Sequence, residues 1–140
     1  MEDPMNDTTK TAAQTITWPT LNYADAPAAI QFLTEAFGFT AELVVESDAD
    51  ASVIEHAQLR WPEGGGIMLG TANREGNAFS LRPTGAAATY VATDKPDELY
   101  KRAMAAGAKI FHELQDEDYG SRGFSVTDPE GNIWSFGTYV

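Results

Sequence analysis

Three polar side chains alternate with apolar ones in one short segment: His56, Gln58 and Arg60 occupy every second position, with Ala57 and Leu59 between them. Side chains alternate between the two faces of a β-strand, so this pattern predicts a strand with one polar and one apolar face. Imidazole, amide and guanidinium groups on one face could hydrogen-bond a ligand. The same alternation is typical of a sheet surface that faces solvent, and the pattern alone leaves both interpretations open.

The composition limits the chemistry available elsewhere in the chain. There are no cysteines, which excludes disulfides, a cysteine nucleophile and a cysteine metal site. The second histidine, His112, shares strand parity with Ile110 and Leu114, so we expect it to be packed or partly buried. The glycines at 64–66 fall in a predicted hairpin turn and lack the Lys-Ser/Thr of a phosphate loop. No Ser/His/Asp order matches a nucleophile elbow.

The elements that would position these residues follow from an internal repeat. Short matches recur in the same order in the two halves: Asp25-Ala26-Pro27 and Asp94-Lys95-Pro96, Gly38 and Gly107, and Pro62-Glu63-Gly64 and Pro129-Glu130-Gly131. The first two pairs are 69 residues apart and the third is 67 apart, which a two-residue length difference reconciles. We infer a duplicated unit.

Each half predicts the same order of elements. In the first half, a strand over 16–23 leads to Asp25 as N-cap, a helix that ends at Gly38, and strands near 41–46, 52–61 and 66–70. In the second half, a strand over 88–92 leads to Asp94 as N-cap, a helix that ends at Gly107, and strands near 109–115, 123–127 and 132–139. The turns before the last strands carry the Pro-Glu-Gly matches.

The predicted fold class is α+β, with two βαβββ modules that form cupped mixed sheets. We expect a flexible polar tail over 1–15 and a single domain over 16–140, made of modules 16–72 and 86–140. Neither half has an obvious core of its own. One face of each sheet is covered by its helix, and the other face must pair with something.

The doubled βαβββ pattern resembles the vicinal oxygen chelate superfamily, also called the glyoxalase/bleomycin resistance/dioxygenase family. The resemblance is carried by residues 20–39 (TLNYADAPAAIQFLTEAFGF), 56–70 (HAQLRWPEGGGIMLG) and 118–136 (DYGSRGFSVTDPEGNIWSF). The first module looks closest to the bleomycin-resistance and PhnB-like branches. The resemblance implies modules that face each other around a cavity, a homodimer, and either metal-dependent catalysis or metal-free antibiotic binding.

In enzymes of this family, His, Gln or Glu on the first and last strand of each module hold a metal ion. The equivalent positions here are Trp18, Ala88 (or Ala87), Met68 (or Leu69) and Ser135. Indole, methyl, thioether and hydroxyl groups do not make a site for a hard divalent cation. The resemblance therefore implies no metal and no other cofactor in this chain.

Strand alternation on the expected fold predicts which side chains face the cavity. The predicted ligand-binding residues are Trp18, Thr20, Asn22, His56, Gln58, Arg60, Met68, Ser125 and Ser135. An indole, a thioether and several hydrogen-bonding groups suit a bulky, partly aromatic small molecule. The prediction is a small-molecule binding protein of the antibiotic-resistance type, with no catalytic residue.

Two other functions remain open. A divergent metal-dependent lyase, isomerase or dioxygenase would need an unusual ligand set, such as His56 with Glu55 or Glu113. A regulatory or scaffolding domain is the third class.

The net charge is −12, from 9 Lys and Arg against 21 Asp and Glu, so binding to nucleic acid or to an anionic membrane is not expected. No signal peptide or apolar span is visible, which favours a cytoplasmic protein. Two acidic clusters occupy equivalent places near the hairpins of the two modules: Glu42, Glu46, Asp48 and Asp50, and Glu113, Asp116, Glu117 and Asp118. If these clusters border the cavity, they favour a cationic ligand.

Overall fold

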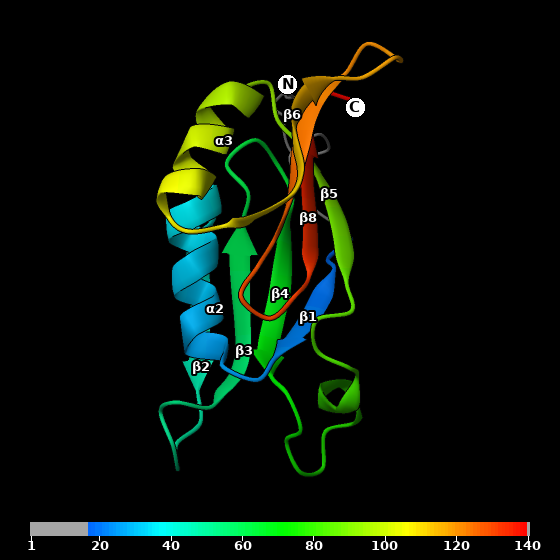
Figure 1. Ribbon diagram of the computed structural model, residues 1–140. Helices are drawn as coiled ribbons and strands as arrows, with labels where there is room; N and C mark the ends of the chain where they lie inside the picture. The colour runs from blue at the N-terminus through cyan, green and yellow to red at the C-terminus, as the bar shows by residue number, and fades with distance from the viewer. Residues whose placement is uncertain (1–16, 140) are drawn as a thin grey trace, which may run out of the picture.

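The computed structural model describes residues 17–139, which form two four-stranded mixed sheets (Figure 1). The first sheet has the order β1-β4-β3-β2 and contains β1 (Thr20–Tyr23), β2 (Thr40–Glu46), β3 (Ile54–Arg60) and β4 (Gly66–Thr71). The second has the order β5-β8-β7-β6 and contains β5 (Ala88–Ala92), β6 (Lys109–Asp116), β7 (Arg122–Thr127) and β8 (Ile133–Gly137). In each sheet the first and last strands pair in parallel and the other neighbours are antiparallel. The predicted α+β class with two βαβββ modules is confirmed.

The first helix begins where the sequence predicts. The Asp25 side chain accepts a hydrogen bond from the Ala28 backbone N–H, and Pro27 lies in the first turn of α2 (Ala26–Phe32). The helix continues as a π-helical turn, η2 (Leu33–Phe37), which the sequence did not predict. Gly38 then ends it at φ +90°, in the left-handed region that favours glycine.

The start of the second helix corrects the prediction. Asp94 does not cap α3 (Pro96–Ala105), and within residues 17–139 no side chain fulfils the usual N-cap role there. The carboxylate of Glu63 instead accepts hydrogen bonds from the Thr93 hydroxyl and the Asp94 N–H, at 2.9 and 3.1 Å. Glu63 belongs to the Pro-Glu-Gly turn of the first module, so a turn that is distant in the sequence holds the segment that leads into α3.

The second module makes an equivalent contact with the first. The carboxylate of Glu130, in the Pro-Glu-Gly turn of the second module, accepts hydrogen bonds from the Ala24 and Asp25 N–H groups at 2.7 and 2.8 Å. Each module therefore binds the strand–helix junction of the other. These reciprocal contacts hold the two modules of one chain against each other with approximate twofold symmetry.

One hydrophobic core serves both modules. Phe37 of the first helix contacts Phe136 of β8 at 4.8 Å between ring centroids, and Trp61 contacts the same ring at 5.8 Å. Phe39 packs against Trp134 at 5.7 Å. As expected from the sequence, neither module has an independent core: the buried apolar residues of both form one cluster.

A buried carboxylate lies at the edge of this core. Asp128 is 4% exposed and accepts hydrogen bonds from the Tyr23 hydroxyl at 2.7 Å and the Trp134 indole N–H at 3.0 Å. The Asn132 amide donates to the same carboxylate at 3.1 Å. Burial and the charge of Asp128 raise the pKa of Tyr23 well above its usual range. Tyr23 and Asp128 come from different modules, so this pair also ties the halves together.

Both helices lie on one side of the two sheets (Figure 1). The opposite side of each sheet is called its helix-free face below. No helix among the described residues has the length and apolar composition needed to cross a membrane.

Candidate functional site

The helix-free face of the first sheet brings predicted site residues together. Thr20 is the register partner of Met68, and Met68 is the register partner of Gln58. These three side chains therefore form a row across β1, β4 and β3. Arg60 is two residues beyond Gln58 on the same face, opposite Gly66.

Trp18 and Arg60 are in direct contact on this face. The Arg60 guanidinium carbon lies 5.0 Å from the centroid of the Trp18 ring, a cation–π distance. A Cβ on Gly66 would come within 2.7 Å of the Trp18 ring, so the missing side chain leaves room for the indole. Trp18 lies on the sheet as predicted, although it precedes β1, which begins at Thr20 rather than at residue 16.

Glu42 joins this group, which the sequence did not predict. Its carboxylate accepts hydrogen bonds from the Arg60 guanidinium, at 3.0 and 3.3 Å, and from the Gln58 amide. The Arg60 and Gln58 hydrogen bonds lower the pKa of Glu42. A β-bulge between Ala41 and Leu43 turns Glu42 onto the helix-free face. Glu42 is therefore part of the sheet surface, and the prediction that it belongs to an acidic rim at the hairpin is wrong.

The side chain of Asn22, which was predicted to face a ligand, is hydrogen-bonded to the backbone of another segment. Its amide donates to the backbone oxygens of Phe79 and Arg82, at 2.6 and 3.4 Å. Phe79 lies within the 3₁₀ turn η3 (Ala78–Leu81) and Arg82 directly follows it, in the connection between the modules. Asn22 thus anchors this connection over one end of the first sheet.

His56 is half-buried at the opposite end of β3 from Arg60. It lines an open hollow of about 600 Å³ together with Val45, Glu55, Arg74 and Asn77. Glu113, the other partner considered for a metal site, belongs to β6 in the second sheet. Within residues 17–139 no group of three or more His, Cys, Asp or Glu side chains is placed to hold a metal ion.

The helix-free face of the second sheet carries a continuous polar row. His112, Ser125, Ser135 and Tyr90 are successive register partners across β6, β7, β8 and β5. The hydroxyl oxygens of Ser125 and Ser135 lie 2.6 Å apart. These two serines lie on the predicted face, with Ser125 only 9% exposed.

His112 and Tyr90 were not predicted to belong to this row. A bulge between Ile110 and His112 changes the strand parity, so His112 is exposed on the helix-free face instead of packed with Ile110 and Leu114. Bulges leave no clear signal in the sequence. Tyr90, in contrast, shares parity with Ala88 and could have been found from the alternation of β5.

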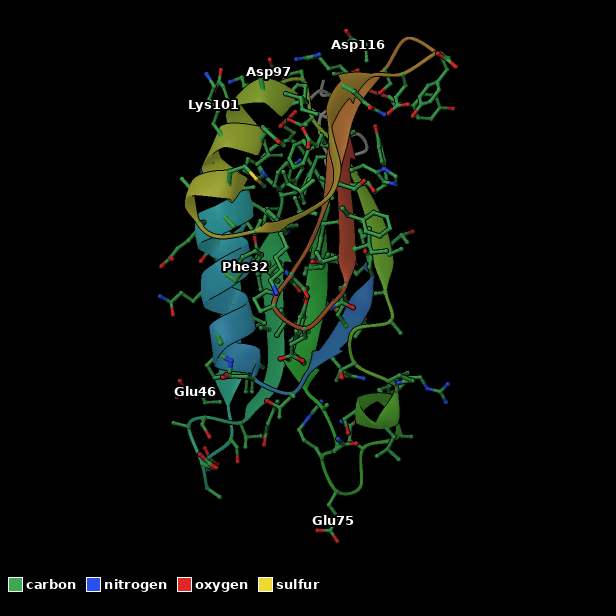
Figure 2. The ribbon with its side chains drawn as sticks, viewed as in Figure 1. Phe32, Glu46, Glu75, Asp97, Lys101 and Asp116 are labelled. Carbon is green, nitrogen blue, oxygen red and sulfur yellow. The ribbon has the colours of Figure 1, made fainter. Side chains whose placement is uncertain are left out.

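The nine predicted residues thus fall into two groups, one on each sheet. The two modules adjoin at a hollow of about 260 Å³ lined by Trp61, Gly66 and Tyr90, among others, and none of the nine predicted residues lines it. The acidic side chains Glu46 and Asp116 lie at opposite ends of the molecule (Figure 2). Asp116 pairs with Arg122 at 3.2 Å.

The donor set does not fit the metal that this fold implies. Trp18 is engaged with Arg60, Met68 is paired in register with Thr20, and Ser135 shares its hydroxyl contact with Ser125. None of these side chains is a good ligand for a hard divalent cation. The side chains gathered on these faces offer an aromatic ring, a thioether and hydrogen-bonding groups.

The chain is similar to mycobacterial proteins in sequence. It is 33% identical over 127 residues to the uncharacterized protein Rv0887c of Mycobacterium tuberculosis, and the match covers 87% of this chain and 73% of that protein. The uncharacterized protein Mb0911c of Mycobacterium bovis matches with the same identity, over 82% of its length.

Solved structures show the same fold. TioX from Micromonospora sp. ML1 is 29% identical, with a TM-score of 0.73, and the alignment covers 89% of this chain and 100% of TioX. A superfamily member from Sphaerobacter thermophilus DSM 20745 is 20% identical, with a TM-score of 0.63, over 87% of this chain and 97% of that chain. The sequence model of the Glyoxalase/Bleomycin resistance protein/Dioxygenase superfamily matches residues 15–136. The chain therefore belongs to the Glyoxalase/Bleomycin resistance protein/Dioxygenase superfamily.

Proposed function

We propose that this protein binds a bulky, partly aromatic small molecule on its helix-free faces, without a metal and without a chemical step. The observation that carries the proposal is the group formed by Trp18, Arg60 and Glu42. The carboxylate fixes the guanidinium, and the guanidinium packs on the indole. A rigid aromatic surface bordered by hydrogen-bonding groups is the usual composition of a site for ring-containing ligands. Sequestration of an antibiotic-like compound is the role that we infer.

The proposal includes a homodimer. Large apolar side chains are exposed on the helix-free faces: Leu43 is 46% and Val45 is 38% exposed beside Gln58 and His56, and Phe111 is 52% exposed on β6. Exposed apolar patches of this kind mark interfaces or ligand-binding grooves. A second copy that covers these faces would enclose a cavity between the two chains. A cytoplasmic location and the division into a tail and one domain stay predictions.

The binding proposal can be tested with a panel of aromatic natural-product antibiotics. A ligand present at a hundred times its Kd should stabilise the folded protein by about 2.7 kcal/mol, which appears as a rise in Tm. Trp18→Ala should abolish that rise. Phe79→Ala is the matched control, because Phe79 is a 79% exposed aromatic side chain in the connection between the modules and is not part of the Trp18–Arg60–Glu42 group.

Two results would contradict the proposal. Stabilisation that is unaffected by Trp18→Ala would place the ligand elsewhere. A stoichiometric transition metal in protein purified without chelator, lost in His56→Ala, would favour the metal-dependent enzyme instead.

A further inference from the structure

Three tyrosines gather at the end of the second sheet where the β6–β7 hairpin turns. Tyr90 comes from β5, Tyr119 from the hairpin turn and Tyr139 from the segment after β8. Their exposed fractions are 48%, 68% and 61%. We call these three residues the aromatic corner. It continues the polar row of the helix-free face, because Tyr90 is the register partner of Ser135.

The aromatic corner is held in place by specific contacts. The Tyr90 hydroxyl donates a hydrogen bond to the Tyr139 backbone oxygen at 2.7 Å. The rings of Tyr119 and Tyr139 are perpendicular, with centroids 5.9 Å apart. A Cβ on Gly137 would lie 3.1 Å from the Tyr90 hydroxyl oxygen, so the glycine leaves space for the phenol to cross β8.

Tyr119 is positioned by a closed turn. The Glu117 N–H donates to the Ser121 oxygen at 2.7 Å, and the Gly120 N–H donates to the Glu117 oxygen at 3.0 Å. Gly120 has φ +88°, which favours glycine at this position. The turn therefore fixes the backbone at Tyr119, whose exposed ring packs against Tyr139.

The electrostatic surroundings of the aromatic corner are negative. Residues 113–121 contain four carboxylates and no Lys or Arg. The next cation along the chain, Arg122, is already bound by Asp97 at 2.8 Å and Asp116 at 3.2 Å. Burial raises the pKa of Tyr90, so its phenol stays neutral at physiological pH. Arg122 pairs with one of these four carboxylates, Asp116, so the segment stays net negative, and aromatic faces next to net negative charge attract a cation and repel an anion.

We propose that the aromatic corner binds an organic ammonium group, so that the ligand of this protein is a cationic aromatic compound. This inference rests on the proposed function and specifies the class of its ligand. A cation is attracted to a ring when it lies within about 6 Å of the centroid. Two perpendicular rings 5.9 Å apart allow a single ammonium group to contact both. The remainder of the ligand would extend from Tyr90 along the hydroxyl row of the same face.

The probe for this site is benzyltrimethylammonium, compared with its neutral isostere neopentylbenzene, in an NMR titration of the full chain. We expect the ammonium probe to shift the backbone amide signals of Gly120, Ser121 and Thr138. The neutral isostere should bind about tenfold more weakly. Higher salt should weaken only the ammonium probe, because it screens the carboxylates.

Variants separate a cation site from a general apolar patch. Tyr119→Leu should weaken binding of the ammonium probe by about tenfold, because the leucine keeps the apolar bulk and loses the ring face. Tyr119→Phe should bind nearly as well as the unmodified chain. Phe79→Leu is the control, since it removes an equally exposed ring far from the acidic hairpin.

The possible outcomes distinguish this inference from the proposed function. Equal binding of the two probes, or no effect of Tyr119→Leu, would overturn the ammonium site. If that happens while an antibiotic still binds in a Trp18-dependent manner, the proposed function stands and only the aromatic corner is misassigned. If the probe binds at the corner but no aromatic ligand depends on Trp18, the proposed function fails instead.

Discussion

At the scale of single residues, the Glu42–Arg60–Trp18 group makes Trp18 a reporter of the candidate site. Trp61 and Trp134 are buried, whereas Trp18 is half-buried, so added iodide or acrylamide quenches mainly Trp18. Glu42→Gln should release the Arg60 guanidinium and increase that quenching. Glu46→Gln, a change of the same kind at the end of β2, is the control. Unchanged quenching in Glu42→Gln would show that the carboxylate does not hold Arg60 over the ring.

The same group predicts how the quenching of Trp18 fluorescence depends on pH. Because hydrogen bonds lower the pKa of Glu42, its carboxylate stays ionised throughout the neutral range. Any stability that it contributes is present above the pKa of an unfolded glutamate and is lost as the pH falls through its lowered folded value. Quenching of Trp18 should therefore be constant from pH 8 to about pH 5 and rise only in more acidic solution. A change centred near neutral pH would contradict this assignment.

Tyr23 gives the strongest residue-scale prediction for stability. Tyr23→Phe leaves the buried Asp128 with one donor fewer, which should lower the free energy of unfolding by about 1–3 kcal/mol in chemical denaturation. The exposed Tyr119→Phe should change it by less than about 0.5 kcal/mol. Because the folded pKa of Tyr23 is raised, the unfolded chain releases this proton first as the pH rises above about 10, and stability should fall there. Equal stability of the two variants would refute the role of this hydrogen bond.

At the scale of elements, the Pro-Glu-Gly turns act on the opposite module. Glu130→Ala should lower the free energy of unfolding by about 1 kcal/mol, and Glu63→Ala by somewhat less, because Glu63 is more exposed. Glu75→Ala, in an exposed loop, is the control. Denaturant titrations of all three variants measure these differences. If Glu75→Ala lowers the free energy of unfolding as much as Glu130→Ala does, the effect comes from net charge and not from the reciprocal contacts.

Regular elements were predictable from this sequence, and contacts between modules were not. The order of strands and helices was predicted correctly from the repeat, from Asp25 at the start of the first helix and from Gly38 at its end. These signals lie close to the elements that they define. The side chains of Glu42 and His112 were assigned to the wrong surroundings because each follows or occupies a bulge that shifts strand parity. Asp94 was assigned a capping role that it does not have, and its backbone N–H is bound instead by Glu63 from about 30 residues away along the chain, a pairing that depends on how the modules dock.

At the scale of the whole molecule, the uncovered sheet faces predict self-association. Size-exclusion chromatography with light scattering should give a dimer at micromolar concentration. Val45→Lys and Phe111→Lys should shift it to a monomer of unchanged secondary structure, because both side chains are exposed in the single chain and neither supports its core. Val44→Lys, which is exposed on the other side of β2, is the matched control. A monomer at all concentrations in the unmodified chain would refute the dimer.

The reciprocal binding of Glu63 and Glu130 has a consequence for protein engineering. Each module recognises the other through contacts that do not involve the covalent connection, and residues 81–84 of that connection are exposed. A chain opened at this point should therefore reassemble from two separately expressed fragments, as a split reporter does. It should also tolerate new termini at this point when the natural ends are joined by a linker. The peptide link between the halves would then raise the effective concentration of one module around the other, while recognition resides in the two turns themselves.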